Sequence, residues 1–244
     1  MWKADKLGYK GNTNYNKAYE GDELVWEKQQ PFQPGNEIWY TSSDGKIVTQ
    51  YSTSALPTIV SNTYVNGKGI IKCASDITII RNRAFYNCTS LTSVTIPDSV
   101  EYITQQAFYG CKGLTSVTIG NSVTNIGNDA FAFCSNLTFV TIPDSVTWID
   151  DEAFLGCRSL TSVIIPNSVT GIERRAFYNC GLTSVTIGNS VTSIGDSTFS
   201  WCISLTTISY TGTIAQWNVI TKDSGWHDDV PATVVHCIDG DVPI

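Results

Sequence analysis

One unit of a repeat reads LTSVTIGNSVTNIGNDAFAFCSN (residues 114–136), and copies of this 23-residue unit follow one another through the middle of the chain. Each step is 23 residues except one of 22, where a residue is missing between Cys180 and Leu182. A fixed period of this length predicts a solenoid, because one unit cannot bury its own apolar face and has to stack on its copies. The positions that mark the register are Phe85, Phe108, Phe131, Phe154, Phe177 and Phe199; Cys88, Cys111, Cys134, Cys157, Cys180 and Cys202; and Leu91, Leu114, Leu137, Leu160, Leu182 and Leu205.

Each unit predicts one coil of the solenoid with one short parallel β-strand. Val94 and Ile96 point inward from a segment rich in β-branched residues, which favours a strand. A Pro-Asp, Pro-Asn or Gly-Asn pair then turns the chain, and Val100 faces inward on the return path. Phe108 and Cys111 follow at a spacing that fits a short helical or 3₁₀ turn. Stacked in this way, the strands are expected to form one continuous sheet along one face.

The pattern Leu-x-x-Val-x-Ile-Pro-x-Ser-Val-x-x-Ile-x-x-x-Ala-Phe-x-x-Cys resembles the BspA-like class of leucine-rich repeats, from about Ile70 to Trp217. The resemblance implies a curved, β-lined solenoid of bacterial surface and secreted proteins. Their usual proposed role is binding host proteins, matrix or other cells, and the resemblance implies no catalysis. The first unit departs from the pattern, since Ile71 and Cys73 stand where later coils have Val and Ile. We therefore expect that unit to be an N-terminal capping coil.

Changes in composition divide the chain into four expected parts. In the last of them, Ile214–Trp217 predicts the start of a short helix and Thr233–Ile238 a final strand. A cap is expected at this end because an exposed repeat edge promotes aggregation. The four parts are a small β-rich N-terminal segment at 1–30, a linker with N-terminal capping hairpins at 31–69, the BspA-like repeats at 70–211 and a C-terminal cap at 212–244.

Two hairpin signals precede the repeats. Ile38–Tyr40 and Ile47–Tyr51 flank an Asp44-Gly45 turn, and Asn66-Gly67 offers a second tight turn just before the first coil. Their strands are expected to cover the open end of the solenoid.

Composition and charge limit the partners. The chain has 244 residues, 42% of them hydrophobic, which is enough for a large core in one elongated domain with appendages. No apolar run reaches the roughly 18 residues of a membrane span, and Lys3, Asp5 and Lys6 interrupt any stretch that could serve as a signal peptide. The net charge of −7 disfavours nucleic acid and anionic membranes. We expect no nucleic-acid partner and no membrane insertion.

The eight cysteines are interpreted as thiols and not as disulfides. Six of them share one core phase, where neighbours would stack about 4.8 Å apart, within disulfide range. Side chains stacked in register point the same way, however, and this spoils the torsion that a disulfide needs. The sequence predicts a ladder of buried free thiols that act as small apolar groups. Cys73 also lies in an apolar phase, whereas Cys237 belongs to the final strand.

Residues with catalytic or metal-binding chemistry are few. Only His227 and His236 exist, so any Cys/His or Ser/His/Asp arrangement would have to form in the C-terminal cap. His227-Asp228-Asp229 with Asp239 and Asp241 offers oxygen ligands for a hard cation, but no recognised ligand spacing is present and a solvated turn is favoured. Asp150–Glu152 is interpreted as a charged loop. We expect no catalytic residue, no cofactor and no metal.

Recognition is expected on the surface of the coils. The outward strand positions are mostly Ser and Thr, as β-propensity on a solvated strand already explains. Phe139 and Ile164 break these rows, and Trp148 stands in a slot that other coils fill with smaller or polar groups, such as Gln216 in the last coil. Exposed apolar groups on a rigid array are typical of interaction sites, although some of them are expected only to cover a neighbouring coil. The candidate partner-binding residues are Phe139, Ile164, Trp148, Phe133, Trp201 and Tyr102.

Together these features predict a non-enzymatic binding or adhesion module of bacterial type, which recognises a protein or glycan on a cell or matrix surface through its β-face. The alternative is a phage or particle-associated receptor-binding protein that uses the N-terminal segment for attachment. Binding of ice by the Ser/Thr rows would need unbroken ladders, and an enzyme ranks last. The resemblance places the protein at the cell surface or outside the cell, and the lack of a signal peptide in this chain leaves a particle or the cytoplasm open. The sequence does not fix the oligomeric state.

Overall fold

The computed structural model describes residues 33–51 and 54–244, together with the backbone of residues 19–20 and 23–24. The chain divides into two compact units, Met1–Pro34 and Gly35–Ile244. In the first unit, β1 (Tyr19–Glu20) and β2 (Glu23–Leu24) pair antiparallel. The remainder of the segment expected at 1–30, and the linker up to residue 32, lie outside the described residues.

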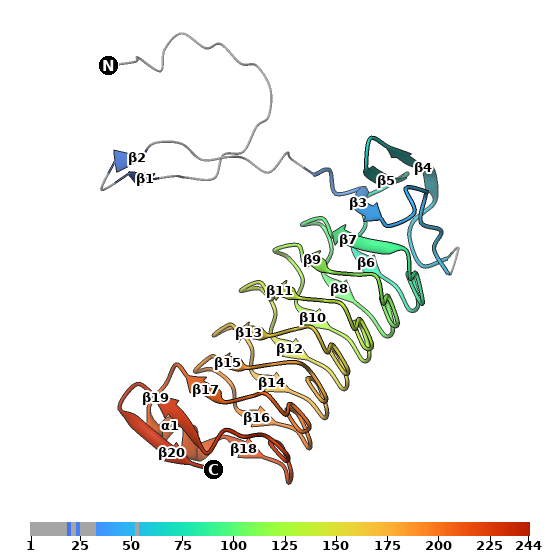
Figure 1. The fold of residues 1–244 in the computed structure, drawn as a ribbon. Helices are drawn as coiled ribbons and strands as arrows, with labels where there is room; N and C mark the ends of the chain where they lie inside the picture. Colours follow the sequence, from blue (N-terminus) through green and yellow to red (C-terminus); the bar gives the residue numbers. More distant parts are fainter. Residues whose placement is uncertain (1–18, 21–22, 25–32, 52–53) are drawn as a thin grey trace. The chain divides into compact units, whose positions relative to one another are not determined.

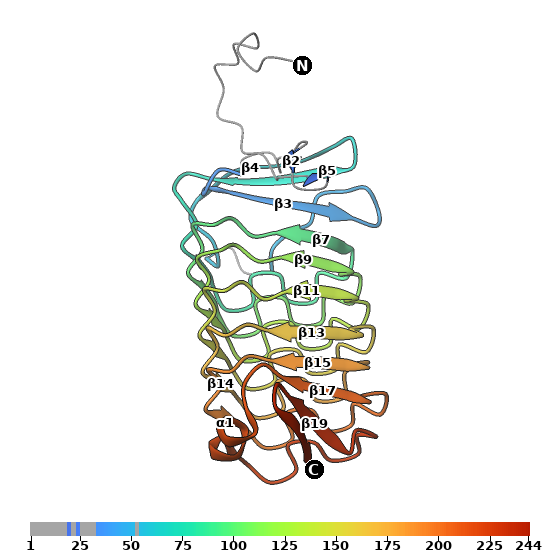
Figure 2. The ribbon, with the colours of Figure 1, turned by 90° about the vertical axis from the view of Figure 1, so that its left-hand side faces the viewer.

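The second unit is a β-solenoid in which successive coils stack along one axis (Figure 1), as the repeat predicted. The longer strands lie one above another on one side of the stack, which we call the β-face (Figure 2). Neighbouring repeats align residue for residue, so that Val94 pairs with Val117 and Val117 with Val140. The repeat strands of the β-face are β7 (Leu91–Thr95), β9 (Ser116–Thr118), β11 (Phe139–Thr141), β13 (Ser162–Ile165), β15 (Ser184–Ile187) and β17 (Thr207–Tyr210).

A second parallel sheet runs along the return path of the coils, which the sequence had predicted only as an inward-facing segment. Each of its strands is two residues long, and in most of them the second residue is a buried isoleucine such as Ile103 or Ile126. The seven strands are β6 (Ile79–Ile80), β8 (Tyr102–Ile103), β10 (Asn125–Ile126), β12 (Trp148–Ile149), β14 (Gly171–Ile172), β16 (Ser193–Ile194) and β18 (Thr221–Lys222).

The core of the solenoid is a stack of phenylalanine rings. From Phe85 to Phe199, neighbouring rings lie nearly parallel, with centroid distances from 5.0 to 5.5 Å. Each ring is carried by consecutive turns closed by i→i+3 hydrogen bonds, such as that from the Cys111 amide to the Phe108 carbonyl. No helix forms in these turns, because the residue before the repeated alanine is left-handed, with φ of 57° at Gln106.

At the N-terminal end the β-face is extended by antiparallel strands: β3 (Glu37–Ser42), β5 (Lys68–Cys73) and β4 (Ile59–Val65), in that order outward from β7. The Asn66-Gly67 hairpin is confirmed, with φ of 51° and 80° at its two turn residues. The expected partner of β3 is wrong: Ile47–Tyr51 forms no strand, because β5 and β7 occupy both edges of β3. The strand of the first repeat unit, β5, is therefore part of a hairpin and does not stack as a coil.

At the C-terminal end, α1 (Ile214–Val219) and β19 (Val234–Cys237) confirm the predicted helix and strand, but β19 is not the last strand, because β20 (Gly240–Pro243) follows and pairs with it antiparallel. Thr213 caps the helix in a capping box with Gln216. The helix lengthens the last coil, so that Thr221, and not Gln216 as expected, takes the position beside Ser193 in the second sheet. Within the described part of the chain, no helix has the length and apolarity needed to cross a bilayer.

Candidate functional site

The β-face is interrupted between β11 and β13. The strands on the N-terminal side form one sheet in the order β11-β9-β7-β3-β5-β4, and those on the C-terminal side form another in the order β13-β15-β17-β19-β20. The expectation of one continuous sheet is therefore wrong at this step. On the other side of the same two coils the structure is unbroken, since Trp148 pairs with Gly171 and the rings of Phe154 and Phe177 stack at 5.2 Å. The opening is confined to the β-face.

Hydrogen bonds that repeat from coil to coil are missing at this step. The Thr138 amide donates to the Thr115 carbonyl at 3.0 Å, and the Thr183 amide donates to the Thr161 carbonyl at 2.8 Å. The intervening bond, from the Thr161 amide to the Thr138 carbonyl, does not form. At the next turn, Ser145 Oγ donates to the Val123 carbonyl at 2.7 Å.

The counterpart of Ser145 one coil later is Ser168, and its Oγ is buried without a partner among the described residues. The missing backbone bond thus coincides with a buried hydroxyl that has no partner among those residues. Such unmade bonds are unfavourable in a native structure, and we treat this step as the candidate site.

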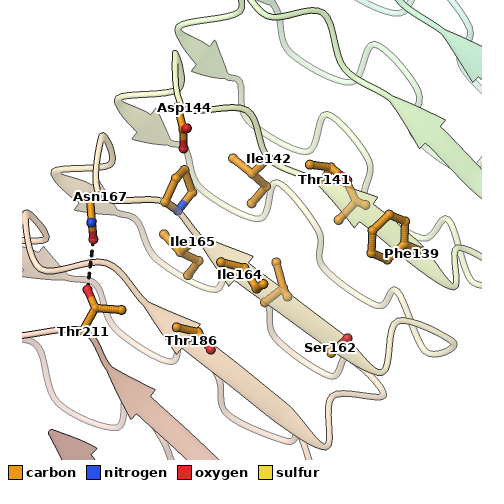
Figure 3. Close-up of a pocket in the computed structure, with 13 residues that line it drawn as sticks. Phe139, Thr141, Ile142, Asp144, Ser162, Ile164, Ile165, Asn167, Thr186 and Thr211 are labelled. Carbon is orange, nitrogen blue, oxygen red and sulfur yellow. Dashed lines mark hydrogen bonds between the residues drawn. The ribbon is translucent and has the colours of Figure 1, made fainter. Parts of the chain in front are cut away.

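A groove of about 440 Å³ occupies the opening (Figure 3). Phe139 stands on its β11 side and Ile164 on its β13 side, and both come from the rows of outward-facing residues. The side chains are 59% and 68% exposed, respectively, although both are large and apolar. Inward-facing valines and isoleucines of the two strands, including Val140 and Ile165, form the apolar floor.

The turns at one end of the groove supply its polar groups. Thr211 Oγ1 donates to Asn167 Oδ1 at 2.9 Å (Figure 3). The same oxygen accepts the Asn189 amide at 3.0 Å. Asp144 lines the groove with an exposed carboxylate that forms no ion pair within residues 33–51 and 54–244. The repeat pattern predicts Asp144 and Asn167 only as turn residues, and nothing in it distinguishes them from their equivalents.

Two of the six predicted partner-binding residues cover a glycine of the next coil. Trp148 lies over Gly171, where a Cβ atom would come within 2.5 Å of the indole ring. Phe133 lies over Gly156 in the same way, at 3.0 Å from such an atom. These rings fill the space of a missing side chain, and this covering of a neighbouring coil was expected for some of the six.

Two more of the six predicted residues, Tyr102 and Trp201, are exposed on elements that do not line the groove. Tyr102 belongs to β8 of the second sheet, and Trp201 lies in the turn that follows Phe199. The groove therefore brings together only Phe139 and Ile164 from the predicted set.

Phe133 and Trp201 share a backbone feature that was not predicted from the sequence. Both have left-handed conformations, with φ of 58° and 62°. The other residues in this column are Asn87, Gly110, Gly156 and Asn179, which tolerate that conformation far better than aromatic residues. The presence of Asn or Gly at four of the six positions of this column was the sequence signal for a left-handed residue. A bulky residue in this conformation is locally strained, and the stacking of the coils has to compensate for that strain.

The C-terminal acidic cluster does not assemble into a metal site. Asp239 Oδ1 accepts the Ile214 amide at 2.7 Å, and Asp241 Oδ1 lies 2.8 Å from His236 Nδ1. No group of three His, Cys, Asp or Glu side chains with a geometry for a metal ion occurs in the described ranges. Burial lowers the pKa of His227, which favours its neutral form at neutral pH.

Comparison with known proteins agrees with this geometry. Residues 124–219 match the BspA-type leucine-rich repeat region, in six copies. Over these residues the chain carries BspA-type leucine-rich repeats. Proteins with BspA-type repeats are generally non-enzymatic. None of the curated proteins matches the chain.

Solved structures of bacterial proteins resemble the repeat region of this chain. The T. pallidum leucine-rich repeat protein is 26% identical, with 75% of this chain and 73% of that chain covered and a TM-score of 0.54. A leucine-rich cell surface protein from Faecalibacterium prausnitzii A2-165 is 33% identical over 73% of this chain and 54% of that chain, with a TM-score of 0.45. The pneumococcal vaccine antigen PcpA is 19% identical over 70% of this chain and 47% of that chain, with a TM-score of 0.53, and shows the shared fold alone. The chain thus spans about half the length of the Faecalibacterium and pneumococcal proteins.

Proposed function

We propose that this chain is a non-enzymatic adhesion module of a bacterial surface protein that captures a protein or glycan in the groove between β11 and β13. BspA-type repeats are typical of bacterial surface proteins of adhesion type, which supports the location and the general role. The observation that carries the site is the exposure of Phe139 and Ile164 across an opening in an otherwise regular face.

The physical argument rests on desolvation. Most repeat strands place Ser at the position of Phe139 and Thr at that of Ile164, and these polar residues suit a solvated strand. Two large apolar groups in the same positions gain free energy when a partner removes them from water. Truncating a buried contact of this kind at an interface typically weakens binding by about 1 to 3 kcal/mol.

The test is binding of the purified chain to arrays of matrix proteins and glycans, with Phe139→Ser and Ile164→Thr singly and together. Both changes restore the repeat consensus and leave an outward strand position, so folding should be unchanged. Ile203→Thr is the matched control for Ile164, because its side chain is 72% exposed on a turn away from the groove. Trp201→Ser, at 54% exposure, is the control for Phe139. Loss of binding in the groove variants alone supports the site.

Ionic strength separates the groove from the acidic cap. Apolar contacts dominate the groove, so its binding should change little with salt. A cationic partner held by carboxylates such as Asp228 and Asp239 would instead be released as salt screens the charges. Full binding by the double variant, combined with loss of binding at high salt, would move the site to the cap and refute the proposal.

A further inference from the structure

We propose a second binding site, at the N-terminal end of the repeat array, for a sugar ring that carries a carboxylate. A pocket of about 340 Å³ lies where the first coil meets the segment that follows β3. It is lined by Tyr51, Ser54, Ala55, Arg81, Asn82 and Arg83. No residue of this pocket belongs to the groove between β11 and β13.

The pocket concentrates positive charge on an acidic protein. Arg81 and Arg83 are exposed, and neither forms an ion pair with the residues that the structure describes, although the chain as a whole has a net charge of −7. Other arginines of the array, Arg174 and Arg175, pair with carboxylates in the neighbouring coil. Arg83 donates from Nε to Gln106 Oε1 at 2.8 Å, which orients the guanidinium and leaves its terminal nitrogens available. The paired donors of a guanidinium match the two oxygens of a carboxylate.

An aromatic surface adjoins the two arginines. Tyr51 is 63% exposed, and its ring lies 5.3 Å from that of Tyr86. Tyr86 in turn stacks on Tyr109, with 5.0 Å between the ring centroids. The guanidinium carbon of Arg83 lies over the Tyr86 ring, 5.4 Å from its centroid. An exposed ring face is a partner for the apolar C–H face of a pyranose, whereas an inorganic anion or a phosphoryl group has no such face to offer. Aromatic faces beside a pair of guanidinium groups therefore favour an acidic sugar over inorganic phosphate and other anions that have no apolar face.

Backbone hydrogen bonds hold the walls of the pocket together. The Tyr51 amide donates to the Ala84 carbonyl at 3.0 Å, and the Arg81 amide donates to the Ala55 carbonyl at 3.2 Å. The two walls come from segments of the chain that are tied to each other on both sides of the pocket.

Titration calorimetry of the full chain tests this site with two matched pairs of probes, sialyllactose against lactose and tetragalacturonate against cellotetraose. At least one acidic probe should bind, and the neutral probe of that pair should not. Arg81→Gln and Arg83→Gln should each weaken binding about ten- to a hundredfold, the value of a charge-assisted hydrogen bond. Tyr51→Ala should also weaken it. Arg158→Gln, which removes an exposed arginine from a distant turn, should leave it unchanged.

Three outcomes would overturn the inference: no binding of either acidic probe at millimolar concentration, equal binding of a neutral probe, or displacement of the bound sugar by an equal concentration of inorganic phosphate. Phe139→Ser and Ile164→Thr should have no effect on acidic-sugar binding. The failure of this site and the failure of the groove are therefore distinguishable.

Discussion

The thiol of Cys157 donates a hydrogen bond to the backbone carbonyl of Phe131 in the preceding coil, with 3.3 Å between sulfur and oxygen. Four further thiols of the ladder repeat this contact, so each fills apolar space and also donates a hydrogen bond to a buried carbonyl. A sulfur atom does both with little desolvation, because it is a weak donor on a small apolar group. The four are Cys111 to Phe85 at 2.9 Å, Cys134 to Phe108 at 3.2 Å, Cys180 to Phe154 at 3.1 Å and Cys202 to Phe177 at 3.1 Å.

These thiols should resist alkylation in the native protein. Burial raises the pKa of Cys111 and Cys180 well above the usual range, and it raises that of the half-buried Cys88 to about 12 with a contribution from Cys111. A raised pKa means less thiolate at any given pH, and thiolate is the reactive form. At pH 8 we expect slow maleimide labelling of the ladder, followed by rapid labelling of all eight cysteines in denaturant, as counted by mass spectrometry. Rapid native labelling of five or six thiols would contradict the buried ladder.

Removing one ring from the phenylalanine stack should destabilise the solenoid strongly. Phe154 is fully buried between the rings of Phe131 and Phe177, at 5.4 and 5.2 Å. We expect Phe154→Ala to lower the free energy of unfolding by about 3 to 5 kcal/mol, from lost burial and the cavity that remains. Urea denaturation followed by circular dichroism measures the change. Phe139→Ala, at an exposed ring, is the control and should change stability by about 0.5 kcal/mol or less.

Two equivalent serines should respond differently to the same substitution. Ser145→Ala removes the bond to the Val123 carbonyl and should lower the free energy of unfolding by about 1 kcal/mol. Ser168→Ala removes a buried hydroxyl that has no partner among the described residues, so it should be neutral or slightly stabilising. Chemical denaturation of the two variants side by side makes the comparison. Equal destabilisation by both would mean that Ser168 Oγ is hydrogen-bonded in solution.

The interior of the coils could be predicted from the sequence because the 23-residue period assigns every residue to a column. A column that always contains Phe or Leu can only face inward, whatever the details of the turns. The path of the chain before the first repeat could be predicted less directly from the sequence. Hairpin signals marked Asn66-Gly67, but the choice between Ile47–Tyr51 and β7 as the partner of β3 depends on which edges are free in three dimensions.

The candidate site followed from the sequence only in part. Departure from the consensus identified Phe139 and Ile164, because a period makes exceptions visible. The same criterion also selected Phe133 and Trp148, although each is followed 23 residues later by a glycine, Gly156 or Gly171, over which it lies. A large residue one period before a glycine is thus the signature of a coil-covering side chain. The opening beside Phe139 has no such signature, because the strands on both sides keep the usual β-branched pattern.

Hydrogen exchange can show directly whether the β-face is open in solution. The amides of Thr138 and Thr183 donate to the coils before them, at 3.0 and 2.8 Å, and should exchange slowly. Thr161 occupies the same position between them, and its amide lacks the corresponding bond to Thr138. We expect its exchange, measured residue by residue by NMR, to be faster by at least tenfold, because exchange there needs no opening of the sheet. Comparable protection of all three amides would show that β11 and β13 pair in solution and would remove the groove as a preformed site.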